Sequence, residues 1–124
     1  MYFKSEKKEL DYNVFNILED YPNIVYTSSS VVKELFQLFR IGRLKVKTIK
    51  SEKDIFFLLK EAGIEIVIFN QFHLEKCAEL VIAEGHKDMN DHAIIAQAIS
   101  DKIPLISSDS KFHLYEKQGL KLII

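Results

Sequence analysis

Four acidic side chains stand where predicted helices and strands begin or end. The stretch HKDMNDHAIIAQAISDKIPLISSD places Asp88 and Asp91 before an apolar helical segment, and Asp109 directly after an apolar strand segment. Glu34 lies in a helical segment that follows an earlier strand. Acids that gather at one edge of a sheet repel one another unless a cation neutralises them. Because carboxylate oxygens are hard ligands, this pattern predicts a site for Mg²⁺ or Mn²⁺ rather than for zinc.

The position of Glu34 on its helix is unusual for a charged residue. At about 100° per residue, Glu34 falls beside Val31, Leu38 and Ile41 on the apolar side of the helix. An ionised carboxylate held against a core is costly unless it is paired, hydrogen-bonded or bound to a metal. Two interpretations stay open: a metal-binding role, or a salt bridge or boundary position that is open to water.

Each of the three aspartates also has a structural interpretation. Asp91 precedes HAIIAQA and Asp109 precedes SKFHLYEK, in each case where a helix N-cap belongs. Aspartate is a usual N-cap residue, and the helix dipole favours its negative charge. Asp88 taken alone fits an ordinary loop acid. The interpretation as a metal site rests on the prediction that these acids lie together at one edge of the sheet.

A basic stretch follows the helix that contains Glu34. RIGRLKVKTIK, residues 40–50, holds five basic residues and no acid. Arg40, Arg43 and Lys45 are candidates to bind RNA phosphates beside Glu34, since phosphate contacts supply much of nucleic-acid affinity. A solvated loop surface is the other interpretation. The formal charge of −1 gives the whole chain no field that favours polyanions, so any nucleic-acid site has to be a local patch.

The elements that position these residues follow from apolar runs, helical periodicity and caps. Apolar runs predict strands over residues 23–29, 64–69, 103–108 and 120–124. Periodic segments predict helices over residues 12–20, 30–42, 51–63, 71–85, 91–102 and 110–119. Asp11, Ser30 and Ser51 are the predicted N-caps of the first three helices, and Ser51 forms a capping box with Asp54.

The alternation of these elements predicts the fold class. Strands that are apolar throughout and alternate with helices are typical of an α/β fold, in which helices cover both faces of a mostly parallel sheet. In open sheets of this kind, sites form beyond the carboxyl ends of the strands. We therefore expect the four acids to converge on one edge of the sheet.

The length and composition limit the classes of protein to which the chain can belong. With 124 residues and 48% hydrophobic content, we expect one domain over residues 1–124. No apolar run approaches the roughly 20 residues of a membrane-spanning helix, and the N-terminus lacks the apolar segment of a signal peptide, so we expect a cytoplasmic protein without a membrane partner. The single cysteine, Cys77, lies in a periodic apolar run and is expected to be a buried thiol. The four histidines show no zinc-binding spacing.

With Glu34, Asp91 and Asp109 in these places, the chain resembles a PIN-domain ribonuclease of the kind found as the toxin in bacterial type II toxin-antitoxin pairs. The resemblance runs from about Ser5 to Ile124, and it is strongest in YTSSSVVKEL, HKDMNDHAIIAQAISDKIPLISSDSKF and YEKQGLKLII. It implies a three-layer α/β/α fold with a mostly parallel central sheet. It also implies hydrolysis of RNA phosphodiester bonds with Mg²⁺ or Mn²⁺, and an antitoxin protein as partner.

The same resemblance assigns roles to individual residues. Glu34, Asp91 and Asp109 match the acids that bind the catalytic metal, Asp88 would be an accessory acid, and Ser108 would lie near the metal site. The implied chemistry agrees with the physics of such a site. Metal ions held by carboxylates can lower the pKa of a water, orient it toward the phosphorus and stabilise charge on the leaving oxygen.

The chain departs from this family at its N-terminus. The family begins with an apolar strand that ends in an aspartate, in a motif like Leu-Asp-Thr, and that aspartate is a principal metal ligand. ELDYNVF is the nearest equivalent, but the polar residues before Asp11 do not suit a central strand, so we interpret Asp11 as the N-cap of the helix over residues 12–20. We therefore expect an N-terminally truncated domain that lacks the first strand, binds metal weakly and cleaves RNA poorly or not at all. A second copy of the chain could supply the missing strand, which makes a homodimer one expectation.

Two other functions stay open at this point. A catalytically inactive PIN-like module that binds an antitoxin or RNA would keep the fold without the cleavage. A receiver-like signalling domain also places clustered acids on an α/β sheet. The receiver-like domain needs paired acids at the end of its first strand, and this sequence lacks them.

Overall fold

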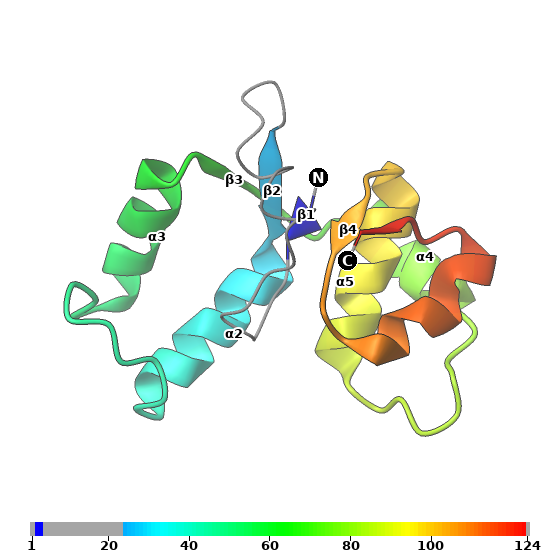
Figure 1. Ribbon diagram of the computed structural model, residues 1–124, viewed down its shortest axis with the longest axis horizontal. Coiled ribbons are helices and arrows are strands. Elements are labelled where there is room, and N and C mark those ends of the chain that lie inside the picture. The colour runs from blue at the N-terminus through cyan, green and yellow to red at the C-terminus, as the bar shows by residue number, and fades with distance from the viewer. Residues whose placement is uncertain (1, 4–23, 124) are drawn as a thin grey trace.

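The computed structural model describes residues 2–3 and 24–123, in which strands and helices alternate (Figure 1). The strands are β1 (Tyr2–Phe3), β2 (Val25–Ser28), β3 (Ile64–Val67), β4 (Leu105–Ile106) and β5 (Leu122–Ile123). The helices are α2 (Ser29–Arg40), α3 (Glu52–Glu61), α4 (Gln71–Glu79), α5 (Met89–Asp101) and the 3₁₀ helix η1 (Ser110–Gln118). Every element predicted after residue 23 is present in the predicted order, which confirms the α/β class. The helix predicted over residues 12–20, with Asp11 as its N-cap, lies outside the described residues.

The strands form one sheet in the order β3-β2-β1-β4-β5. All four strand pairings are parallel. The longest ladder joins β2 to β3, where Val25 lies opposite Ile64 and Ser28 opposite Val67. Parallel neighbours need crossover connections, and the helices between the strands supply them. The parallel sheet that the apolar strands predicted is therefore confirmed.

The centre of the sheet is occupied by β1. Tyr2 lies opposite Tyr26 of β2 and opposite Leu105 of β4, and Phe3 lies opposite Ile106. We expected the place of the family's first strand, between β2 and β4, to lack a strand from this chain. Two residues of the same chain lie there and pair with both neighbours. The absence of the family's first strand and its aspartate stays a prediction, because residues 4–23 lie outside the described residues. The homodimer also stays a prediction.

The start of α2 differs by two residues from the predicted one. Ser28, not Ser30, is the N-cap, because Ser28 has extended backbone (φ −81°, ψ 146°) and its Oγ accepts a hydrogen bond from the backbone N–H of Ser30 at 3.1 Å. The helix ends at Ile41, which is followed by Gly42 with φ +77°. The capping box of α3 is confirmed, since the Asp54 carboxylate accepts from the backbone N–H of Ser51 at 3.1 Å.

Helix α4 is shorter than the helix predicted over residues 71–85. It ends at Glu79 because Leu80 adopts extended backbone (φ −64°, ψ 130°) and buries its side chain in the core. His73 ties α4 to α5: its Nδ1 accepts from the backbone N–H of Asn70 at 3.0 Å, and its Nε2 donates to the Asp101 carboxylate at 2.8 Å. The residues after α4 therefore form a loop that leads to α5.

The core gathers around α5, β4 and η1. Ile94 and Ile95 from α5 pack with Leu105 from β4 and with Phe112 and Tyr115 from η1, and all five side chains are buried. Each such side chain contributes about 1.5–3 kcal/mol relative to an exposed position. The residues that flank the candidate acids of α5 and η1 are therefore held by the best-packed part of the described chain.

The described residues fall into two halves with β1 between them. Residues 25–67 (β2, α2, α3 and β3) form the first half, and residues 71–123 (α4, α5, β4, η1 and β5) form the second, as Figure 1 shows. Gln97 of α5 joins the halves, because its Oε1 accepts from the Ser28 hydroxyl at 2.5 Å and its Nε2 donates to the Val67 carbonyl at 3.1 Å. Within residues 2–3 and 24–123, no helix has the length and apolar character to cross a bilayer.

Candidate active site

The strand order identifies one place in the fold for a site. Along the chain, the sheet grows from β1 toward β3 on one side and from β4 toward β5 on the other, so the direction of winding changes at β1 and β4. Ligands of open parallel sheets bind at such a switch point, beyond the carboxyl ends of the strands. Glu34 follows β2 in the second turn of α2, Asp109 follows β4, and Asp88 and Asp91 lie at the start of α5. The segments that carry the four acids all reach this edge of the sheet, but within the described residues no three of these acids lie close enough together to share a metal ion.

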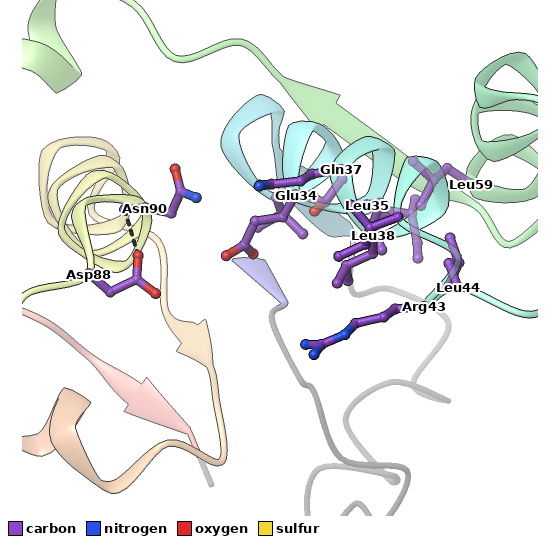
Figure 2. Close-up of a pocket in the computed structure, with 13 residues that line it drawn as sticks. Glu34, Leu35, Gln37, Leu38, Arg43, Leu44, Leu59, Asp88 and Asn90 are labelled. Atoms are coloured by element: carbon purple, nitrogen blue, oxygen red, sulfur yellow. Dashed lines mark hydrogen bonds between the residues drawn. The ribbon is translucent and has the colours of Figure 1, made fainter.

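A cavity of about 690 Å³ is lined by α2 and the loop after it, by residues of β2, α3 and β3, and by the start of α5. Glu34 lines it from α2, Asp88 from the N-cap position of α5, and Arg43 from the loop after α2. Figure 2 shows the carboxylates of Glu34 and Asp88 directed into the space between the two helices, with the Arg43 guanidinium below Glu34 in this view. The apolar wall is formed by Val31, Leu35, Leu38, Ile41, Leu44, Leu59 and Ile64. Low-dielectric walls of this kind strengthen the attraction between the two carboxylates and a cation.

Glu34 occupies the face of α2 that the helical pattern predicted. It lines the cavity together with Val31, Leu38 and Ile41, and it is half-buried. Lys33, on another face of α2, is exposed. A half-buried carboxylate among apolar side chains needs a hydrogen-bond partner or an opposite charge. A salt bridge and a bound metal would both meet this need, so the metal-binding role of Glu34 stays a prediction.

Asp88, rather than Asp91, is the N-cap of α5. Its carboxylate accepts from the backbone N–H groups of Asn90 at 2.9 Å and Asp91 at 3.4 Å, and its backbone is extended (φ −74°, ψ 107°). The interpretation of Asp91 as the cap, and of Asp88 as an ordinary loop acid, is therefore wrong. Both aspartates precede the same apolar run, and only the backbone conformation selects between them. Asp88 is exposed, so its carboxylate caps the helix and lines the cavity at once.

Asp91 is buried instead of exposed, with 5% of its surface accessible. It occupies the first turn of α5, where the helix dipole favours its charge. His86 Nε2 lies 3.2 Å from Asp91 Oδ2, and His86 is also buried. Asp91 does not belong to the cavity lining that holds Glu34 and Asp88.

Asp109 is the N-cap of η1, as predicted. Its carboxylate accepts from the backbone N–H of Lys111 at 2.9 Å, and it is half-buried. Ser108 precedes it and is exposed. Among residues 2–3 and 24–123, no group of three His, Cys, Asp or Glu side chains lies close enough together to hold a metal ion. The acids that share the described cavity are Glu34 and Asp88.

The three candidate phosphate-binding cations differ in their surroundings. Arg40 Nε donates to the Glu52 carboxylate at 2.7 Å, and this hydrogen bond lowers the pKa of Glu52 below its ordinary value. Arg43 lines the cavity, and Lys45 is exposed on the loop that follows. Of the three candidates, Arg43 is therefore the one that lines the same cavity as Glu34 and Asp88, while Arg40 is engaged in an ion pair on the surface.

Comparison with known proteins defines the family. The family model for the PIN domain matches residues 1–118 of the chain. The chain belongs to the PIN-domain family. Its PIN domain is similar to a chain in the crystal structure of VapBC2 from Rickettsia felis bound to a DNA fragment from their promoter, with a TM-score of 0.58, 20% identity, and coverage of 90% of this chain and 80% of that one.

A second solved structure gives a similar result. The PIN domain resembles a chain of VapBC-5 from Mycobacterium tuberculosis, a member of the VapBC family of toxin-antitoxin systems, with a TM-score of 0.54, 25% identity and coverage of 80% of each chain. No curated protein matches the chain. These likenesses agree with the α/β fold and the parallel sheet that the sequence predicted.

Three residues that shape this PIN domain were not predicted from the sequence. Gln97 stands in the middle of the apolar run HAIIAQAI, and a polar residue inside a buried helix is a signal that could have identified it. His86 and Tyr115 form a buried hydrogen bond of 2.6 Å between Nδ1 and the phenol oxygen. They are 29 positions apart, so no local pattern connects them.

Proposed function

We propose that this PIN domain is a metal-dependent endoribonuclease, the toxin of a toxin-antitoxin pair, which hydrolyses RNA phosphodiester bonds in the cytoplasm. Glu34, Asp91 and Asp109 hold Mg²⁺ or Mn²⁺, with Asp88 and Ser108 as accessory groups. The family match over residues 1–118 and the likeness to VapBC chains support the class of activity. The observation that carries the proposal is the cavity that Glu34 of α2 and Asp88 at the N-cap of α5 both line.

The acids at this cavity suit a magnesium ion. Mg²⁺ keeps several waters and is usually bound by one or two carboxylates together with substrate phosphates, so it does not require a cage of protein ligands. Glu34 and Asp88 offer two carboxylates, and Asp91 stands one helical turn from Asp88 on α5. When bound, the cation would lower the pKa of a water and stabilise charge on the leaving oxygen.

The protein's own side chains contribute charge and orientation. Asp88 is fixed by the backbone N–H groups that it caps, so its carboxylate lies in one direction before any ligand arrives. Arg43 places a guanidinium at the same cavity, where it can bind an RNA phosphate and hold it beside the acids. Lys45 extends this positive surface along the loop.

The experiment is cleavage of a labelled RNA by the purified chain with Mg²⁺ or Mn²⁺, with and without EDTA. We expect cleavage that EDTA abolishes and that Asp91→Asn removes. Asp88→Asn keeps an N-cap residue while removing the charge, so we expect it to reduce cleavage with little loss of stability. Cleavage that persists in EDTA, or that Asp91→Asn leaves unchanged, would contradict the metal mechanism. Gln71→Asn, at an exposed position of α4, is the matched control.

A second candidate is a catalytically inactive PIN-like module that binds an antitoxin or RNA. It is favoured by one observation, namely that residues 2–3 and 24–123 contain no three-ligand metal group. If the chain binds labelled RNA without cleaving it, and if the RNA affinity does not depend on the Mg²⁺ concentration, the result would support this second function. Purification of the chain with a small co-expressed antitoxin is expected under both functions and does not separate them.

A further inference from the structure

Two side-chain amides line the same cavity as the acids of the candidate active site. Gln37 lies on α2, three residues after Glu34, and Asn90 lies in the first turn of α5, two residues after Asp88. Figure 2 shows the amides of Gln37 and Asn90 directed into the space between the two helices. Each half of the described chain therefore contributes one carboxylate and one amide to this cavity.

Both amides are open to a ligand. Gln37 and Asn90 are exposed, and within residues 2–3 and 24–123 neither side-chain amide forms a hydrogen bond with another residue. Two glutamines with structural roles behave differently. The Gln97 amide donates to the Val67 carbonyl, and the Gln118 amide bonds the backbone of Val81 through both of its ends. The amides at the cavity thus keep their donors and acceptors for a partner outside the described residues.

The cavity also has the other surfaces that a nucleotide needs. Its volume of about 690 Å³ lies within the range of about 300–1,000 Å³ that is typical of pockets for small ligands. Arg43 provides a guanidinium for a phosphate. The flat face of a base can lie against the apolar wall, which includes the side chains of Leu35, Leu38, Leu44 and Leu59.

The amides and the acids together favour one base. A side-chain amide presents a donor beside an acceptor, and this pair matches the N6 amino group and N7 of adenine. In single-stranded RNA, the base edges are open to such contacts. Glu34 and Asp88 repel carbonyl oxygens and attract amino groups at the same cavity. Adenine is the RNA base that has an amino group and no carbonyl oxygen.

We propose that Gln37 and Asn90 are specificity-determining residues, which read an adenine base of single-stranded RNA beside the phosphate that Arg43 binds. The inference rests on the proposed function, because it names the RNA sequence that the same cavity accepts. It requires no metal ion, since the amides bind the base edge directly.

The first test measures the affinity of the purified chain for labelled oligouridines by fluorescence anisotropy in EDTA. The central bases of the oligomers are adenine, cytosine, guanine or uracil. We expect the adenine oligomer to bind about ten-fold more tightly than the uracil oligomer. Gln37→Met and Asn90→Leu keep side chains of similar size but remove the donor and the acceptor, so each should lower this ratio to about three-fold or less.

Two further substitutions control for effects that are not specific to a base. Arg43→Ala should weaken the binding of all four oligomers alike, because phosphate contacts carry no sequence information. Gln71→Met, at an exposed position of α4, is the matched control for Gln37→Met and should change neither the affinities nor their ratio. A merely structural role of the amides would lower all four affinities equally, so the ratio separates the two roles.

The second test sequences the fragment ends after cleavage of a mixed-sequence RNA with Mg²⁺. We expect adenine to be enriched beside the cut sites of the unaltered chain. This enrichment should decrease with Gln37→Met and with Asn90→Leu, while the total cleavage decreases less. Gln71→Met should leave the distribution of cut sites unchanged.

The outcomes separate the inference from the function on which it rests. Binding or cleavage without an adenine preference, or a preference that either amide substitution leaves unchanged, would overturn the inference and leave the proposed function in place. A chain that neither binds nor cleaves any of the RNAs would overturn the proposed function and the inference with it. An adenine preference that both amide substitutions lower, and that Arg43→Ala keeps, would support the inference.

Discussion

Gln97 gives the most direct test of how the two halves of the described chain are joined. Its side chain is completely buried, and it bonds Ser28 at the end of β2 and the carbonyl of Val67 at the end of β3. Gln97→Leu keeps a similar volume and removes both hydrogen bonds. The change therefore isolates the polar link between α5 and the first half from the apolar packing around it.

The expected loss of stability follows from the polar groups that would lose their hydrogen-bond partner. Loss of the hydrogen bond to Val67 costs about 1 kcal/mol, and a buried Ser28 hydroxyl without its acceptor costs about 1–3 kcal/mol, so we expect Gln97→Leu to lower the free energy of unfolding by about 2–4 kcal/mol. Ser28→Ala also removes the N-cap of α2, which adds about 1 kcal/mol to its own cost. Because the double variant leaves neither partner orphaned, its cost should fall short of the sum by about 1–2 kcal/mol.

Urea unfolding followed by circular dichroism measures these free energies. The slope with urea should stay the same, so that the midpoints report stability alone. Gln71→Leu, at an exposed position of α4, is the matched control and should change the stability by less than about 0.5 kcal/mol. Additive costs of Gln97→Leu and Ser28→Ala within about 0.5 kcal/mol would refute the reasoning.

Two further predictions concern the basic stretch. Arg43→Ala and Lys45→Ala should each reduce the slope of log affinity against log salt concentration for single-stranded RNA by about 0.7. Arg40→Ala should change this slope less, because Glu52 already binds the Arg40 guanidinium. Fluorescence anisotropy measures the slopes, and equal effects of the three substitutions would contradict the assignment. The hydrogen bond from Arg40 lowers the pKa of Glu52 below its ordinary value, so the stabilisation from this exposed pair is complete above the ordinary pKa and is lost as the pH falls through the lowered pKa. The melting temperatures of the unaltered chain and Glu52→Gln should converge in acid, and a constant difference would count against this pair.

The elements and the face of Glu34 could be predicted from sequence because they depend on local periodicity. Apolar runs predicted the strands, and the spacing of Val31, Leu38 and Ile41 predicted that Glu34 shares their face of the helix, which lines the cavity. The capping box of Ser51 and Asp54 was equally local. In these cases, residues within one or two turns of one another determine the outcome.

The details that depend on contacts between distant segments could not be predicted. Asp88 and Asp91 are three residues apart and both suit an N-cap, and the choice follows from the backbone of the preceding loop and from His86, which binds Asp91. The three consecutive serines at the start of α2 posed the same ambiguity, which Gln97 resolves by accepting from Ser28. Tyr115 meets His86 only because η1 folds back against the loop before α5.

The division of the described chain into two halves bears on its mechanics. Glu34 belongs to the first half and Asp88 to the second, and both line the same cavity. A cation that bound both carboxylates would act as a clasp between the halves. The binding energy of such an ion would then also strengthen the attachment between the halves, in proportion to its concentration relative to its dissociation constant.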